Sequence, residues 1–283
     1  MSAQAAGSGT KKVTDSAELA APGRSVVRVL FRRLRGILFA DPAIVLATIF
    51  YGSISLTISF FDRKRNGFAQ HGVARAWARM LLRVSGVRVQ VEGLEQIEAG
   101  RSYVFISNHL SYMDTPVVLA HVPVQFRFLA KRGLFQIPLL GTHLHRAGHI
   151  RVPREDPRGA VKTMQMAAET IQKQGISLLV FPEGGRSHDG MLRPFKEGGA
   201  YIAIRAGVPV VPLALLGTRQ ILPYGGGVVE SGSVVLRILK PIDTAAMSLK
   251  DRGSLTEAVR ALIANELRES EETPLASTAT GLR

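Results

Sequence analysis

Residues 176–215, ISLLVFPEGGRSHDGMLRPFKEGGAYIAIRAGVPVVPLAL, decide the fold class. Their first apolar run, residues 176–181, has the length and composition of a buried strand. A helical pattern follows at residues 197–206, and a second apolar run at residues 209–215 predicts another strand. A strand, a helix and a strand in this order are typical of an α/β domain.

The same alternation extends over most of the chain. Five more short β-rich runs predict strands at residues 87–91, 103–107, 126–130, 148–152 and 234–239. Three more helical patterns occupy residues 68–84, 157–172 and 254–267. We therefore predict an α/β fold with a mixed, largely parallel sheet flanked by helices, which forms one domain over residues 66–269.

The ends of the chain differ in character from this domain. Residues 1–23 and 270–283 are polar and lack apolar periodicity, so they predict a disordered leader and tail. Residues 24–39 set arginines among apolar side chains, a pattern that suits an anionic lipid surface and also an ordinary solvated helix. Residues 43–61 carry no charge and lie near the lower length for a membrane span. We predict membrane-associating helices over residues 24–65, which cross the bilayer or only dip into it.

The composition narrows the classes of function. A net charge of +14 favours anionic partners, which include acidic lipid, nucleic acid and phosphorylated small molecules. No nucleic-acid motif is present, and one Trp with five Tyr gives few stacking side chains, so nucleic acid is not expected. The chain has no cysteine, which excludes disulfides, thiolate metal sites and a catalytic cysteine. The histidine spacing predicts no metal site.

The clearest chemistry lies in residues 107–114, SNHLSYMD, which follow a predicted strand. In α/β folds such positions present active-site groups. His109 could take a proton from an alcohol near neutral pH, and Asp114 on its other ring nitrogen would fix the tautomer. Five residues on a regular helix would not align the two side chains, so the pair needs a turn between them. Taken alone, a structural histidine explains the pattern as well.

Three other segments could contact a substrate. Residues 181–187, FPEGGRS, offer a close backbone approach at two glycines and a planar guanidinium at Arg186, although a solvated turn would look alike. Residues 146–154, RAGHIRVPR, put arginines within and after an apolar strand, where burial is costly unless an anion meets them. Residues 207–213, GVPVVPL, suit an edge strand, a wall for an acyl chain or plain core.

Taken in order, these segments form a recognisable set. N-H-x4-D, a G-x5-R strand, F-P-E-G and V-P-V-V-P resemble the four motifs of the glycerolipid acyltransferase family, and bacterial 1-acyl-sn-glycerol-3-phosphate acyltransferases most of all. The resemblance implies that His109 is the base and Asp114 its partner. It implies substrate contacts at Asn108, Arg154, Glu183, Gly184 and Arg186, with Pro212 shaping a wall. The sequence departs from the pattern at Gly185, where the family commonly has Thr, and in the residues before Arg154. These departures leave the identity of the acceptor substrate undetermined.

By this resemblance the chain would move a fatty acyl group from acyl-CoA or acyl carrier protein to the free hydroxyl of 1-acyl-sn-glycerol-3-phosphate, giving phosphatidic acid for phospholipid synthesis. No covalent acyl-enzyme is expected, because neither a cysteine nor a G-x-S-x-G elbow is present. No cofactor is expected either, since the acyl thioester is a co-substrate. The expected location is the cytoplasmic face of the inner membrane, with membrane lipid and a lysophospholipid as partners. Alternatives are glycerol-3-phosphate, a lyso-ornithine lipid or another lysolipid as acceptor, or a non-catalytic lipid-binding protein.

Overall fold

The computed structural model describes residues 34, 36–61, 67–153 and 156–272. The predicted leader, most of the basic segment before residue 36, Arg154 and the end of the tail lie outside these residues. All seven predicted strands are confirmed. They are β1 (Val87–Glu92), β2 (Val104–Ser107), β3 (Phe126–Lys131), β4 (Ile150–Val152), β5 (Ser177–Val180), β6 (Val210–Leu216) and β7 (Gly232–Ile238).

The strands form one sheet in the order β1-β7-β6-β2-β5-β3-β4. Every neighbouring pair is parallel except β6 and β7, so the predicted mixed, largely parallel sheet is confirmed. The central strands β2 and β5 are buried along their whole length, which explains their continuous apolar sequences. Because β2 is the middle strand of the sheet, the segment after it starts among the carboxyl ends of its parallel neighbours β5 and β6.

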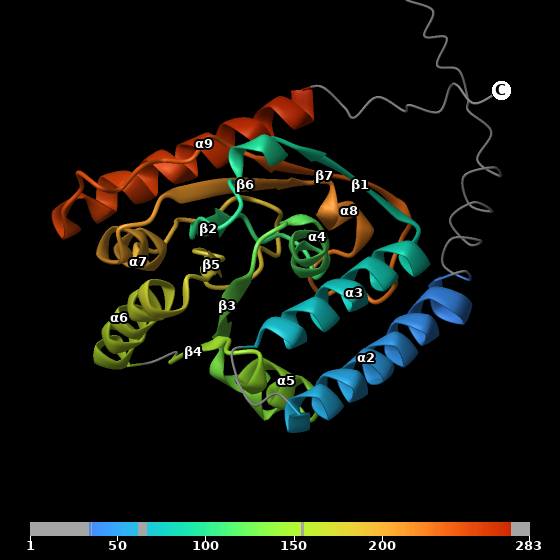
Figure 1. Ribbon diagram of the computed structural model, residues 1–283. Helices are drawn as coiled ribbons and strands as arrows, with labels where there is room; N and C mark the ends of the chain where they lie inside the picture. The colour runs from blue at the N-terminus through green and yellow to red at the C-terminus, as the bar shows by residue number, and fades with distance from the viewer. Residues whose placement is uncertain (1–33, 35, 62–66, 154–155, 273–283) are drawn as a thin grey trace, which may run out of the picture.

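Helices cover both faces of the sheet (Figure 1). On one face pack α3 (Phe68–Ser85) and α4 (Asp114–His121), and on the other pack α6 (Pro157–Gln174), α7 (Gly198–Ala206) and α9 (Arg252–Glu272). Successive residues of β2 alternate between the two cores, with Phe105 in the first and Val104 and Ile106 in the second. The result is a three-layer arrangement in which β2 and its neighbours are shielded from water on both faces.

The helices agree closely with the sequence patterns, apart from some ends. α3, α6 and α7 begin within one residue of their predicted starts. α9 continues to Glu272, so residues 270–272 are helical and do not belong to the predicted tail, in keeping with the helix-forming tendency of glutamate. Shorter elements complete the fold, namely α5 (Leu140–Arg146), α8 (Thr218–Ile221), η2 (Leu94–Gln96), η3 (Arg132–Gln136) and η4 (Leu249–Asp251).

The uncharged run near the N-terminus forms one long helix beside the domain (Figure 1). After η1 (Gly36–Ala40), α2 (Asp41–Phe61) packs against α3 and α5. Hydrogen bonds join it to the domain: the Ser55 hydroxyl is 2.7 Å from His143 Nδ1, and Trp77 Nε1 donates to Thr48 Oγ1 at 3.1 Å. His143 is thus half-buried against α2.

The outer side of α2 is apolar and exposed, including Leu46, Phe50, Phe60 and Phe61. Among the described residues, one helical stretch, Leu38–Phe61, is long and apolar enough to cross a membrane by length and composition, and 11% of its most apolar 18 residues is buried in the protein. A core helix of a soluble protein would bury its apolar residues and expose its polar ones. α2 departs from this arrangement, because its buried residues are Ser55 and Ser59 and large apolar side chains are exposed.

Candidate active site

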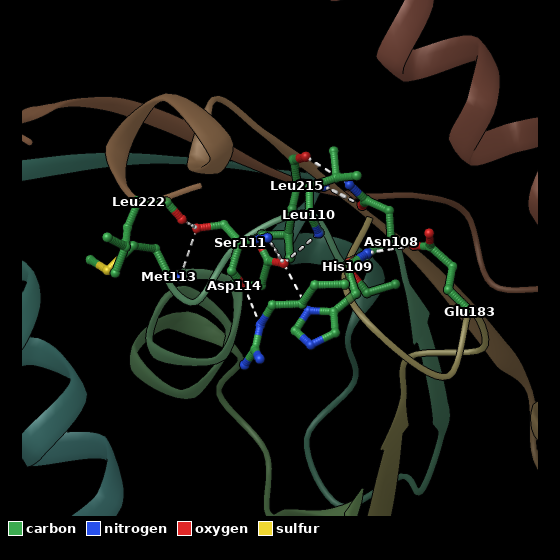
Figure 2. Close-up of polar contacts among 11 residues, drawn as sticks. Asn108, His109, Leu110, Ser111, Met113, Asp114, Glu183, Leu215 and Leu222 are labelled. Atoms are coloured by element: carbon green, nitrogen blue, oxygen red, sulfur yellow. Dashed lines mark hydrogen bonds and ion pairs between the residues drawn. The ribbon is translucent and has the colours of Figure 1, made fainter. Parts of the chain in front are cut away.

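Asn108 anchors the chain where β2 leaves the sheet (Figure 2). Its amide nitrogen donates to the carbonyl of Leu215 on β6 at 2.9 Å, and its amide oxygen accepts from the N–H of Leu215 at 2.9 Å. The side chain therefore replaces a backbone pair of the ladder and is fully buried. The predicted substrate contact of Asn108 is not supported, because both polar ends of its side chain are already engaged. It instead fixes the position of the backbone next to His109.

Asp114, the first residue of α4, returns to His109 through the turn at residues 110–113. Its Oδ2 atom is 2.8 Å from His109 Nδ1 and accepts the backbone N–H groups of Leu110 and Ser111, each at 2.8 Å. The turn that the spacing required is therefore present. Since Oδ2 is an acceptor, the proton of the neutral imidazole lies on Nδ1 and the lone pair on Nε2.

The His109 ring lies flat on Phe181, with ring centroids 3.9 Å apart and planes 15° apart. Burial lowers the pKa of His109, the carboxylate of Asp114 opposes that shift, and the charges of Arg186 and Lys131 lower the pKa further. The side chain is 11% exposed. His109 is therefore a neutral imidazole at neutral pH, able to accept a proton.

The FPEGGRS loop clamps the backbone of His109 from both sides. Glu183 accepts the N–H of His109 through Oε1 at 2.7 Å and that of Arg193 through Oε2 at 3.2 Å, while Ser187 N–H donates to the carbonyl of His109 at 3.2 Å. Burial raises the pKa of Glu183 to about 7. Because its carboxylate is buried and accepts two backbone groups, Glu183 positions His109, and its predicted contact with substrate is not supported.

The glycines of this loop lie beneath basic side chains. Gly184 has a φ of +73°, which favours glycine, and a Cβ there would come within 3.0 Å of Lys196 Nζ. A Cβ on Gly185 would lie 3.4 Å from Lys131 Nζ. The two positions therefore keep the backbone close to two ammonium groups, and side chains there would take up the space beneath them.

Arg186 faces the turn that carries the dyad. Its Nε donates to the carbonyl of Ser111 at 3.1 Å, and its guanidinium lies 4.0 Å from the ring centroid of Tyr112. Burial lowers the pKa of Arg186, which nevertheless stays far above neutrality in any protein. The cation is therefore held beside His109 in a defined orientation.

Two other predictions receive a correction. β6 lies inside the sheet between β7 and β2, and all of it is buried, so the V-P-V-V-P run is plain core, as one of its three interpretations predicted, and the edge-strand interpretation is wrong. Pro212 is tolerated because it precedes the first β6–β7 pair, Leu213 with Ile238. Arg151 is exposed and lies 4.9 Å from the ring centroid of Phe135, so it carries no burial cost.

Comparison with known proteins identifies the family. An acyltransferase family model matches residues 88–216, which include all four motifs. The chain is 30% identical over 233 residues to the 1-acyl-sn-glycerol-3-phosphate acyltransferase of Saccharomyces cerevisiae, covering 82% of this chain and 76% of that one. The chain belongs to the acyltransferase family.

Two other relatives extend this result. The chloroplastic 1-acyl-sn-glycerol-3-phosphate acyltransferase of Brassica napus is 37% identical over 219 residues, and the match covers 75% of this chain but spans only 62% of the plant protein's length. The crystal structure of the 1-acyl-sn-glycerophosphate (LPA) acyltransferase PlsC from Thermotoga maritima superposes with a TM-score of 0.72 at 28% identity. That match covers 89% of this chain and all of the other, so the two share the whole fold.

Sequence patterns missed one residue of this acyltransferase site. Lys131 ends β3, and its charge acts on His109, although a lone lysine at the end of a strand has no local signature. A usable signal was its place at the carboxyl end of a strand in a predicted parallel sheet, beside the strand that leads to Glu183. Within the described residues no three His, Asp or Glu side chains are grouped so that they could hold a metal ion.

Proposed function

We propose that this chain transfers a fatty acyl group from acyl-CoA or acyl carrier protein to the free hydroxyl of 1-acyl-sn-glycerol-3-phosphate, giving phosphatidic acid. The observation that carries the proposal is the His109–Asp114 pair, 2.8 Å apart, with two cations next to it at the carboxyl edge of the sheet. The names of the relatives support the same acceptor.

The proposed reaction is a direct transfer. The Nε2 lone pair of His109 removes the proton of the acceptor hydroxyl as the oxygen attacks the thioester carbonyl. Asp114 stabilises the imidazolium that forms. When the tetrahedral intermediate collapses, the carbon–sulfur bond breaks and the imidazolium returns its proton to the leaving thiolate. No acyl-enzyme forms, and we propose no metal or other cofactor.

The acceptor also accounts for the two cations. In 1-acyl-sn-glycerol-3-phosphate the phosphate is on the carbon next to the one that bears the hydroxyl, so it must bind close to His109. Arg186 and Lys131 are the cations whose charges act on His109, and they suit a phosphate monoester. The family resemblance adds Arg154, which lies outside the described residues.

We expect Arg186→Ala to raise the acceptor KM by about 10–100-fold, because a charge-assisted contact to phosphate is worth roughly 1.5–3 kcal/mol. The donor KM should stay within twofold. Arg205→Ala, an exposed arginine on α7 across the sheet, is the matched control. Arg186→Lys keeps the charge but not the planar Nε contact with Ser111, so its acceptor KM should lie between those of Arg186→Ala and the control. An unchanged acceptor KM in Arg186→Ala would refute the phosphate assignment.

The acceptor itself is tested by a panel. Purified protein is assayed with one labelled acyl-CoA, and then with acyl carrier protein, against 1-acyl-sn-glycerol-3-phosphate, glycerol-3-phosphate, a lyso-ornithine lipid and a second lysophospholipid. The proposed acceptor should give the highest kcat/KM. Turnover with none of them would favour the non-catalytic lipid-binding alternative, and a different best acceptor would correct the substrate.

We further propose that the chain lies on the cytoplasmic face of the inner membrane through residues 24–65. α2 contacts the domain along one side and exposes an apolar outer side, which supports insertion into one leaflet instead of a complete crossing. Insertion of exposed apolar area contributes roughly 25 cal/mol per Å² and is insensitive to salt, unlike the attraction of arginines to anionic lipid.

We expect Leu46→Glu with Phe50→Glu to lower the fraction of protein that sediments with anionic vesicles in high salt, because both side chains are on the exposed side of α2. Leu262→Glu, an exposed leucine on α9, is the control and should sediment like the wild type. Vesicle binding of the double variant at the wild-type level would show that α2 is not the inserting surface.

A further inference from the structure

A cavity of about 700 Å³ is lined by α8 and by the segment between α8 and β7. Its lining includes Arg219 and Gln220 of α8, and Pro223 and Gly227 of the segment that follows. This segment is fastened to the loop that carries the dyad, because the Ser111 hydroxyl donates to the carbonyl of Leu222 at 2.6 Å (Figure 2). An isolated β-bridge also pairs Ser111 with Pro223. The segment that lines the cavity is thus attached to the loop that carries the dyad.

Aromatic and basic side chains connect the cavity with the dyad. Arg186 lies over Tyr112, and the Tyr112 ring stacks on Tyr224 with centroids 5.6 Å apart. Tyr224 meets His188 edge-on at 4.3 Å, and Arg219 donates to the carbonyl of His188 at 3.1 Å. These residues form a continuous wall that leads from the cation beside His109 to the arginine of the cavity.

Arg219 is suited to a second anion. It is exposed, and it forms no ion pair with a carboxylate in the part of the chain that the structure describes. The acceptor phosphate is not that anion, because it must bind next to the hydroxyl at His109, where Arg186 and Lys131 act. Glu230 also lines the cavity, so the lining is not uniformly basic. A long neutral arm with one terminal phosphate fits better.

We propose that this cavity binds the 4′-phosphopantetheine arm of the acyl donor, with Arg219 on its phosphate and Gln220 on an amide of the arm; the assignment rests on the proposed acyl transfer. Acyl-CoA and acyl carrier protein share this arm, which carries the thioester at the end opposite the phosphate. In this assignment the phosphate binds at Arg219, and the arm runs along Tyr224 and Tyr112 toward His109, where the thioester carbonyl meets the acceptor hydroxyl.

Two variants test the cavity in the full-length chain. Arg219→Ala removes the charge. Gly227→Leu fills the space, since a Cβ there meets no atom within 4 Å and the residue does not have a positive φ. Arg205→Ala and Gly72→Leu, at an exposed helical glycine that is equally open, are the matched controls. We expect each cavity variant to raise the donor KM at least tenfold and to leave the acceptor KM within twofold.

Calorimetric titration separates this inference from the reaction. Wild-type protein should bind free 4′-phosphopantetheine more tightly than pantetheine, and Arg219→Ala should abolish that difference. If both donors turn over, the donor KM should rise with each, because they share the arm, and a rise with only one of them would count against the assignment. If only one donor turns over, its KM tests the cavity. Unchanged donor KM and unchanged titration in both variants, or a rise in the acceptor KM instead, would overturn the assignment. If the wild type transfers no acyl group, the proposed function fails, whereas the titration still tests the cavity.

Discussion

His109→Ala should lose nearly all acyl transfer and still fold. The substitution removes the Nε2 lone pair that accepts the hydroxyl proton, and general-base catalysis contributes about 10²–10⁴-fold. The contacts that hold the loop at this position are backbone bonds, to Glu183 and from Ser187, so they survive truncation of the side chain. Turnover of labelled acyl-CoA together with a thermal melt checks both parts of the expectation.

The pH dependence of wild-type activity gives a second test of His109 as the base. Because burial lowers the pKa of His109, the base stays neutral to below pH 6.5, and activity should fall only as the pH drops through that lowered pKa. Protonation favours the unfolded chain at this site, so its contribution to stability is likewise lost on the acid side. His145→Ala, an exposed histidine on α5, should keep the wild-type profile. Near-normal turnover in His109→Ala would show that His109 is not the general base.

The strands could be predicted because their burial is apparent from the local sequence. β2 and β5 are covered on both faces, so apolar residues run on without alternation and end at polar or proline residues. The dyad was predictable for a related reason, since a histidine and an aspartate after a buried strand lie where the chain leaves the sheet. Both signals lie within a few residues of the groups they describe.

What the sequence did not predict depends on pairing between distant segments. The partner of Asn108 is Leu215, 107 residues away, and only the neighbouring position of β2 and β6 makes the asparagine a support for the sheet. From the sequence, Glu183 was predicted to contact substrate, and only the folded loop shows that its carboxylate accepts the N–H of His109. The apolar run of α2 gave no sign that Ser55 would face His143 on a separate helix. Local patterns contain none of these contacts.

Asp114→Asn should lower kcat by about 10²–10⁴-fold with little change in either KM, because the carboxylate supports the base without contacting substrate in the proposed mechanism. Three donors converge on Oδ2, from His109 Nδ1 and from the N–H groups of Leu110 and Ser111. An asparagine oxygen can accept all three, but it no longer balances the imidazolium that forms during proton transfer. In the reverse orientation the amide N–H₂ would face Nδ1 and move the imidazole proton to Nε2, where the base is needed.

Stability distinguishes this variant from a general loss of structure. In the first orientation the new N–H₂ occupies the place of Oδ1, which is buried and has no hydrogen-bond partner within the described residues. An unsatisfied buried donor costs about 1–3 kcal/mol, so Asp114→Asn should melt at a lower temperature than the wild type but through one cooperative transition. Without Asp114, which raises the pKa of His109, the acid limb of any residual activity should move to lower pH. A kcat within twofold of the wild type would show that His109 works without this partner.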